Sequence, residues 1–254
     1  MATAMGRSVI ITGGAGDIGR AAARRFLEAG ASVLLVDLDE RGLQEAVSAL
    51  QSEAVRYRVA DVTSEVDTRG YVEHAVEVFG TVDALVANAG IEGEVAPVSE
   101  YDTASFRKMM DINVTGVFLG IKHVFPVMAA NGGGSIVITS SIAGIKGSSG
   151  ISAYNTSKHA VIGLMRSCAK EGGEHNIRVN TVNPAPVEGR MIRSLEAGLM
   201  PETPDMVRDS MIETIPLNRY GRPEDVANLM VFLASDEAQF LSGGVYMVDG
   251  GMTA

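Results

Sequence analysis

Tyr154 and Lys158, two side chains with complementary acid–base chemistry, are four positions apart in the second half of the chain. On a helix this spacing places both on one face, about one turn apart. A tyrosine hydroxyl is a weak base at neutral pH, but a nearby ammonium group favours the phenolate and lowers the tyrosine pKa. Tyr154 could then exchange a proton with an alcohol. An isolated pair of this kind is more often two neighbours on a helix surface, so the surrounding sequence decides between the two interpretations.

The beginning of the chain predicts a nucleotide site. A short apolar run, 8–12, is followed by Gly13, Gly16 and Gly19 and then by apolar residues at helical spacing. Such glycines let the backbone come close to a pyrophosphate at a helix N-terminus, although an ordinary glycine-rich turn is the alternative. The next apolar run ends in Asp37, at about the distance expected of the acid that binds a ribose 2′-hydroxyl. A carboxylate there repels a 2′-phosphate, so the sequence favours NAD over NADP.

Short apolar runs alternate with amphipathic stretches along the rest of the chain. This alternation predicts an α/β fold with a parallel, doubly wound sheet that binds its ligand at the carboxyl ends of the strands. The expected strands are 8–12, 32–36, 55–60, 83–87, 135–139, 177–182 and 245–248, and the expected helices include 66–79, 103–127 and 223–234. Polar or glycine residues follow several strands, among them Asp61, Asn88 to Gly90, and Ser141. Each group alone could be turn chemistry, but together they predict a cleft at one sheet edge.

Length and composition narrow the possible functions. The chain of 254 residues shows no linker or internal repeat, which favours one domain over residues 1–254. Its net charge of −10 argues against binding to nucleic acid or to anionic membranes, so we expect a small-molecule ligand. No apolar run approaches the length of about 18 to 20 residues that is needed to span a bilayer. The first residues do not resemble a signal peptide, so we expect a cytoplasmic location. Neither the lone Cys168 nor the spacing of the histidines indicates a metal site.

Taken in order, these motifs resemble those of the classical short-chain dehydrogenases/reductases over almost the whole chain. The matching residues are Thr12 to Gly19, Asp37, Asp61 and Val62, Asn88 to Gly90, Asn113, Ser141, Tyr154, Lys158, Asn183 and Pro184, and Val248 to Gly251. The resemblance implies a Rossmann-type three-layer sandwich with a seven-stranded parallel sheet, a nicotinamide cofactor and direct hydride transfer. It also implies a mobile lid over the substrate at about 188–218, and a homotetramer.

The resemblance further implies roles for single residues. Tyr154 would be the general acid or base, and Ser141 would bond to the same substrate oxygen. Lys158 would lower the Tyr154 pKa and bind the nicotinamide ribose. Asn113 would hold a water that connects Lys158 to solvent, although it could instead bond only to nearby backbone. The implied cofactor contacts are Gly13, Gly16, Asp17, Ile18, Gly19, Asp37, Leu38, Asp61, Val62, Asn88, Ala89, Gly90, Thr139, Tyr154, Lys158, Pro184 and Val187.

Three positions depart from the family pattern. The family usually has glycine or alanine at the place of Asp17, and the resulting glycine spacing is like that of the extended branch of epimerases and dehydratases. The 13 residues that separate Ser141 from Tyr154 favour the classical branch. Asp17 either places a carboxylate near the expected pyrophosphate or caps the helix. Ala185 and Gly189 stand where the family commonly has glycine and threonine, which puts one cofactor contact in doubt.

The sequence therefore predicts an NAD-dependent oxidoreductase that interconverts a small or medium, largely apolar secondary alcohol and its ketone. Methionines in the lid favour an apolar substrate, unless they pack against the body of the protein; they are Met191, Met200, Met206 and Met211. An NADPH-dependent 3-oxoacyl reductase is an alternative that Asp37 disfavours. A dinucleotide-sensing or scaffold protein is another, and the complete set of acid–base residues disfavours it.

Overall fold

In the computed structural model, which describes residues 4–254, seven strands form one parallel sheet in the order β3-β2-β1-β4-β5-β6-β7. The strands are β1 (Ser8–Thr12), β2 (Ser32–Asp37), β3 (Val55–Val59), β4 (Ala84–Ala87), β5 (Gly134–Thr139), β6 (Ile177–Pro184) and β7 (Val245–Val248). The predicted sheet is confirmed, with differences of one or two residues at some strand ends. The first three residues of the predicted domain lie outside the described range.

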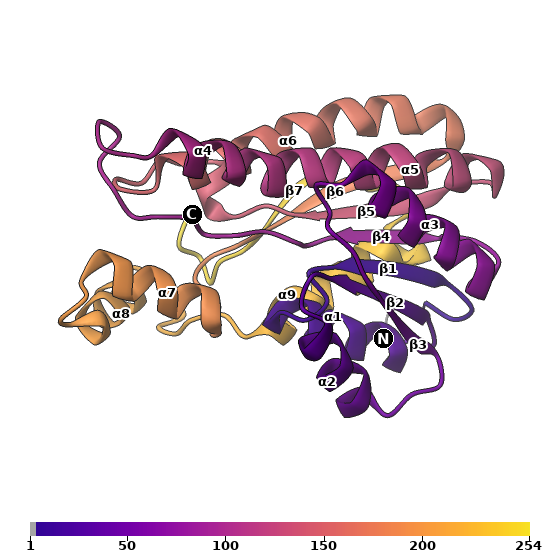
Figure 1. Ribbon diagram of the computed structural model, residues 1–254, viewed down its shortest axis with the longest axis horizontal. Coiled ribbons are helices and arrows are strands. Elements are labelled where there is room, and N and C mark those ends of the chain that lie inside the picture. The colour runs from indigo at the N-terminus through magenta and orange to yellow at the C-terminus, as the bar shows by residue number, and fades with distance from the viewer. Residues whose placement is uncertain (1–3) are drawn as a thin grey trace.

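Helices cover both faces of the sheet, which confirms the three-layer sandwich (Figure 1). One face carries α1 (Asp17–Glu28), α2 (Glu40–Leu50) and α9 (Pro223–Ala234), and the other carries α3 (Glu65–Phe79), α5 (Gly116–Ala130) and α6 (Ser152–Gly172). Helix α4 (Thr103–Met110) leads into α5. Helices α7 (Arg190–Leu199) and α8 (Pro204–Glu213) stand out from one end of the sandwich, drawn in orange in Figure 1.

Alternating side chains on the central strands build the two apolar cores. In β2, Val33 and Leu35 lie in the core under α1 and α2, while Leu34 and Val36 lie in the core under α3 and α5. All four are fully buried because parallel strands with helices on both faces have no solvent-facing side. This explains why the strands appear in the sequence as continuous apolar runs.

Local capping fixes where several helices begin and end. The side chains of Asp39, Ser64 and Asp102 each accept a hydrogen bond from a backbone N–H in the first turn of α2, α3 and α4. Helix α3 ends at Gly80, whose φ of 85° is a left-handed conformation that glycine adopts without strain. The polar residues that border these helices therefore have direct structural roles.

One helix, Thr103–Ala130, is long and apolar enough to cross a membrane, judged by length and composition over residues 4–254. It is continuous because a π-helical turn, Asp111–Thr115, joins α4 to α5. Its most apolar 18-residue window has a mean hydropathy of 1.4. This finding corrects the expectation that no such run exists, because polar residues such as Lys122 interrupt the apolar sequence without ending the helix. In the fold 44% of that window is buried, and Val117 and Val124 pack in the core, as in a core helix.

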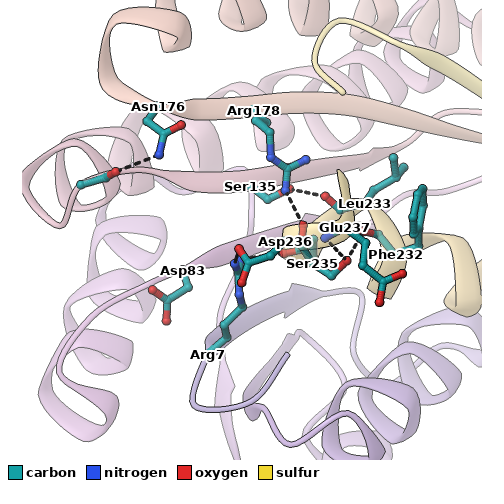
Figure 2. Close-up of polar contacts among 12 residues, drawn as sticks. Arg7, Asp83, Ser135, Asn176, Arg178, Phe232, Leu233, Ser235, Asp236 and Glu237 are labelled. Carbon is teal, nitrogen blue, oxygen red and sulfur yellow. Dashed lines mark hydrogen bonds and ion pairs between the residues drawn. The ribbon is translucent and has the colours of Figure 1, made fainter. Parts of the chain in front are cut away.

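Side chains from the N-terminal edge of the sheet bind the last carbonyls of α9 (Figure 2). The Ser135 hydroxyl donates to the Leu233 carbonyl at 3.0 Å, and the Arg178 guanidinium donates to the Ser235 carbonyl at 3.1 Å. Arg7 donates to the carbonyl of Ala234 at 2.7 Å. The two guanidinium groups lie where the helix dipole is negative, so they stabilise the end of α9 over β5 and β6.

We expect Ser135→Ala to lower the free energy of unfolding by about 1–3 kcal/mol, because the buried Leu233 carbonyl would lose its donor. Both residues have no solvent exposure. Urea unfolding followed by circular dichroism measures the change. The matched control is Ser167→Ala, since the exposed Ser167 hydroxyl donates only to a carbonyl of its own helix; it should shift stability by less than about 0.5 kcal/mol. Equal losses in the two variants would refute the proposed anchoring.

Candidate active site

The order of the strands reverses at β1, which lies between β2 and β4. In open α/β sheets ligands bind outside the carboxyl ends of the strands at such a reversal. The turn that follows β1, residues 13–19, and the segment Asn88 to Gly90 that follows β4 both lie at this point. We call residues 13–19 the dinucleotide turn. The structure thus brings together two groups that the sequence placed at one edge.

The dinucleotide turn has the shape and the free donors that an anion requires. A Cβ added to Gly19 would lie 2.2 Å from the Gly13 carbonyl oxygen, so only glycine permits this tight turn. Gly13 itself has a φ of 67°. Gly16 is the N-cap of α1 and provides no capping side chain, so the first N–H groups of this helix have no side-chain acceptor there. These features fit the pyrophosphate of a dinucleotide.

Asp37, at the end of β2, faces the dinucleotide turn. Its carboxylate accepts a hydrogen bond from the backbone N–H of Ala15 at 3.0 Å and another from that of Asp39 at 3.1 Å. Each carboxylate oxygen keeps a second lone pair, which a ribose hydroxyl could use. Leu38, next to it, is 64% exposed. The geometry suits the predicted ribose acceptor.

Asp61 and Val62, predicted to contact the cofactor, follow β3 at the same edge of the sheet. The Asp61 carboxylate accepts from both the backbone N–H and the hydroxyl of Thr63, each at 2.8 Å. The Val62 side chain is buried against Gly116 of α5. Both hydrogen bonds from Thr63 go to one Asp61 oxygen, so the other oxygen of this carboxylate is not used by them and could accept from a cofactor.

Asn88 links the ends of three strands. The Thr12 hydroxyl accepts the backbone N–H groups of Asn88 and Ala89 at 3.0 and 3.1 Å. The Asn88 side chain donates to the Thr12 carbonyl at 3.2 Å and accepts from the Thr139 hydroxyl at 3.1 Å. The Thr139 carbonyl in turn accepts from the Lys158 ammonium at 2.9 Å. A chain of hydrogen bonds therefore leads from the end of β1 to Lys158.

Asn113 lies on the π-helical turn and is 1% exposed. Its carbonyl oxygen accepts from the backbone N–H of Ile91 at 2.9 Å, and its amide donates to the Ile91 carbonyl at 3.0 Å and to the Ser157 hydroxyl at 3.1 Å. The carbonyl oxygen of Asn113 and the ammonium of Lys158 both border Gly90. Sequence reasoning missed Ile91 and Ser157, because no local pattern links Asn113 to a serine 44 positions away.

Tyr154, Lys158 and Ser141 meet at the same edge of the sheet. The Lys158 ammonium is 5.5 Å from the centre of the Tyr154 ring, as expected from their spacing on α6. Tyr154 is half-buried, and Lys158 is 5% exposed. The Ser141 hydroxyl donates to the Pro184 carbonyl at 3.4 Å and accepts from the backbone N–H of Ala143 at 3.1 Å. These contacts fix the serine at the start of the loop that leads to α6.

Burial is the largest influence on both ionisable groups of the pair. It raises the pKa of Tyr154 to about 12, a hydrogen bond with Ser141 acts to lower that pKa, and the negative charge of Glu92 raises it further. Burial also lowers the pKa of Lys158 to about 8. The net shift of the Tyr154 pKa is therefore upward, opposite to the expected direction, because the loss of water around the phenolate outweighs the influences that lower the pKa. At neutral pH Tyr154 is a phenol and Lys158 is mostly an ammonium.

Two carboxylates meet the first residue of α7. Asp17 accepts the backbone N–H of Arg190 at 3.0 Å, and Glu92, whose side chain is 14% exposed, pairs with the Arg190 guanidinium at 3.4 Å. Asp17 therefore caps α7, whereas the N-terminus of its own helix, α1, has no side-chain cap. Glu92 was not among the predicted residues, and its place three positions after Ala89 is the one signal that could have drawn attention to it.

The remaining predicted residues lie around this edge. Ile18 packs against the core under α1, and Pro184 ends β6. Val187 pairs with Gly221 in an isolated bridge. Within residues 4–254 no three His, Cys, Asp or Glu side chains are grouped so that they could bind a metal ion.

We expect Lys158→Met to change the pH dependence of stability. The pKa of Lys158 is about 8 in the folded protein, whereas its reference value is 10.5. Between these two pH values the unfolded chain binds more protons than the folded protein. The free energy of unfolding of the parent therefore rises with pH in this range. Relative to the variant, the parent should gain up to about 3 kcal/mol over this range.

Urea unfolding at about pH 7 and about pH 9.5 tests this expectation, because the second value lies inside the window but below the tyrosine range. Lys108→Met is the control, since Lys108 is exposed and its removal should leave the pH profile unchanged. Parallel profiles for the parent and Lys158→Met would contradict the burial of a charged lysine.

Comparison with known proteins places the chain in a family. A family model described as Enoyl-(Acyl carrier protein) reductase matches residues 13–253. Levodione reductase from Leifsonia aquatica is 38% identical over 252 residues, which cover 98% of this chain and 94% of that protein. (+)-Borneol dehydrogenase 2 from Salvia officinalis is 39% identical over 255 residues, which cover 98% of this chain and 90% of the relative.

Solved structures agree with these matches. The crystal structure of levodione reductase superposes with a TM-score of 0.95 at 37% identity and covers 97% of each chain. That of NAD⁺-bound xylitol dehydrogenase superposes with a TM-score of 0.91 at 33% identity, covering 97% of this chain and 99% of the other. With its fold, its ordered motifs and these relatives, the chain belongs to the classical short-chain dehydrogenase/reductase family.

Proposed function

We propose that this protein is an NAD-dependent oxidoreductase that interconverts a small or medium, largely apolar secondary alcohol and its ketone. The observation that carries the proposal is the meeting of Tyr154, Ser141 and Lys158 at the edge of the sheet that also bears the dinucleotide turn. Relatives named as a levodione reductase and a borneol dehydrogenase support a reaction on alcohols and ketones.

In this mechanism the protein moves a proton and orients the reactants. A bound nicotinamide cofactor would supply the hydride acceptor for oxidation of the alcohol and, in its reduced form, the hydride donor for reduction of the ketone. Tyr154, once ionised to the phenolate, accepts the hydroxyl proton during oxidation, and as a phenol it donates a proton to the ketone oxygen during reduction. Ser141 stabilises the charge that develops on that oxygen. Lys158, an ammonium at neutral pH, favours the phenolate when Tyr154 ionises and is held in place by its bond to Thr139.

The preference for NAD rests on Asp37. Two backbone N–H groups hold its carboxylate toward the dinucleotide turn, so a negative charge lies where a 2′-phosphate would have to bind. Bringing two like charges into such contact costs several kcal/mol of binding free energy. A loss of this size turns strong binding into weak binding. A ribose 2′-hydroxyl can instead donate to the carboxylate.

We also propose that residues 188–218, called the lid below, cover the substrate within a single domain over residues 1–254. The lid projects from the sandwich (Figure 1), and its Ile192 and Ile215 share a small apolar core with Tyr220 and Met252. Met200 and Met206 are 43% and 62% exposed, whereas Met211 packs in this core. A cytoplasmic homotetramer that binds neither nucleic acid nor membranes is part of the same proposal, supported by the net charge of −10 and by the family resemblance.

A 3-oxoacyl reductase that uses NADPH is the closest rival. The description of the matching family model names an acyl carrier protein, which supports an acyl substrate as the alternative. Tighter binding of NADPH than of NADH would favour this rival over the proposal. A dinucleotide sensor, in contrast, would bind NADH and turn over no alcohol of a broad panel.

We expect Tyr154→Phe to lower kcat by at least about 10²-fold, because the variant cannot exchange a proton with the alcohol. NADH formation, followed by absorbance with a panel of secondary alcohols, measures the loss. Tyr57→Phe is the matched control, since Tyr57 lies on β3 and its hydroxyl only accepts from Gln44. Full activity of Tyr154→Phe would rule out the proposed mechanism.

We expect Asp37→Ser to reduce the preference for NAD over NADP by at least about tenfold in kcat/KM, because the variant removes the charge that repels a 2′-phosphate. Glu40→Gln removes a nearby exposed carboxylate at the start of α2 and serves as the control. Steady-state kinetics with both cofactors test the prediction. An unchanged ratio would show that Asp37 does not select the cofactor.

A further inference from the structure

The first residue of the lid helix is bonded to a carboxylate of the dinucleotide turn. Asp17 accepts the backbone N–H of Arg190 at 3.0 Å, and the two residues are 173 positions apart in the sequence. Gly189, the N-cap of α7, has no side chain that could bond to this N–H. An aspartate at a helix N-terminus satisfies a free donor and interacts favourably with the helix dipole. The cap of α7 is therefore supplied by a distant part of the chain.

Gly189 is required by the same contact. Its φ of 149° is a conformation that residues with a side chain rarely adopt. A Cβ added at this position would lie 2.2 Å from the carboxylate oxygen of Asp17, well inside contact distance. Asp17 and Gly189 are two of the departures from the family pattern, and the structure places them against each other. The aspartate occupies the space that a side chain at position 189 would need.

We propose that Asp17 is a positioning residue that fixes the start of the lid against the dinucleotide turn, with Gly189 as its obligatory partner. The inference rests on the proposed function, since the lid is assigned to a substrate of the dehydrogenase reaction. Arg190 adds a second connection, because its guanidinium pairs with Glu92 at 3.4 Å. The start of α7 thus contacts both the dinucleotide turn and the loop that follows β4.

Limited trypsin digestion of the ligand-free protein tests the contact without relying on activity. Cleavage after Arg193, inside α7, requires local opening of the helix, so its rate reports the open population when reclosing is fast. Asp17→Ala should increase this rate about 5-fold, the change expected for loss of an N-cap. Asp17→Asn keeps an acceptor and should cleave at nearly the parental rate. The control is Asp209→Ala, an exposed carboxylate on α8, which should leave the rate unchanged. Equal rates for Asp17→Ala and the parent would overturn the proposal.

A double-variant cycle tests the pairing of the two positions. Gly189→Thr alone should open the lid, because its Cβ displaces the Asp17 carboxylate. In an Asp17→Gly background, Gly189→Thr should increase the cleavage rate by a factor that is at least about 5-fold smaller, because the obstructing side chain is gone. Effects that simply multiply, with no coupling between the two sites, would show that the two departures are independent.

Kinetics separate this role from cofactor binding. Asp17→Ala should raise the KM for the alcohol or lower kcat, while the dissociation constant for NAD, measured by titration calorimetry, should not increase. Weaker NAD binding with unchanged proteolysis would instead make Asp17 a cofactor contact and overturn the proposal. If the parent protein turned over no alcohol with NAD, the proposed function would fail, and the proteolysis of the ligand-free protein would still decide the lid contact.

Discussion

The side-chain amide of Asn88 holds together the strand ends around which the site is built. It bonds to the backbone of β1 and accepts from Thr139 at the end of β5, and the Thr139 carbonyl binds Lys158. These bonds form only while β1, β4 and β5 keep their register, in which Ile11 lies beside Val86. A one-residue slip would turn every side chain to the opposite face of the sheet. The position of Lys158 therefore depends on the pairing of the central strands.

Packing that orders the acid–base pair also removes it from water. Burial raises the pKa of Tyr154 to about 12 and lowers that of Lys158 to about 8, so it disfavours the charged form of both groups. Near neutral pH the site keeps a proton on the tyrosine and a positive charge on the lysine. This state is ready to donate a proton to a ketone oxygen, and oxidation of an alcohol requires the tyrosine to ionise beside the ammonium.

The lid and the body of the protein are stabilised in different ways. Two large apolar cores hold the helices to the sheet, whereas the lid buries few apolar side chains and relies on polar contacts. Glu196, 1% exposed, accepts from the Tyr220 hydroxyl at 2.9 Å and from Arg193 at 3.0 Å, and Arg208 pairs with Glu188. Because few apolar side chains are buried there, the lid is the part expected to open first. A cap supplied by Asp17 matters more in such a segment than it would in the body.

The sequence by itself determined the strands, the dinucleotide turn, the shared face of Tyr154 and Lys158, and the family, because each of these depends on residue types at short and regular spacing. Only the tertiary structure showed that Asn113 bonds to Ile91 and Ser157 and that Asp17 caps a helix 173 positions away. It also reversed the expected direction of the Tyr154 pKa shift. Hydrogen bonds between distant segments depend on how the whole chain packs, and the loss of water around an ionisable group is a property of its surroundings that spacing along the chain does not record.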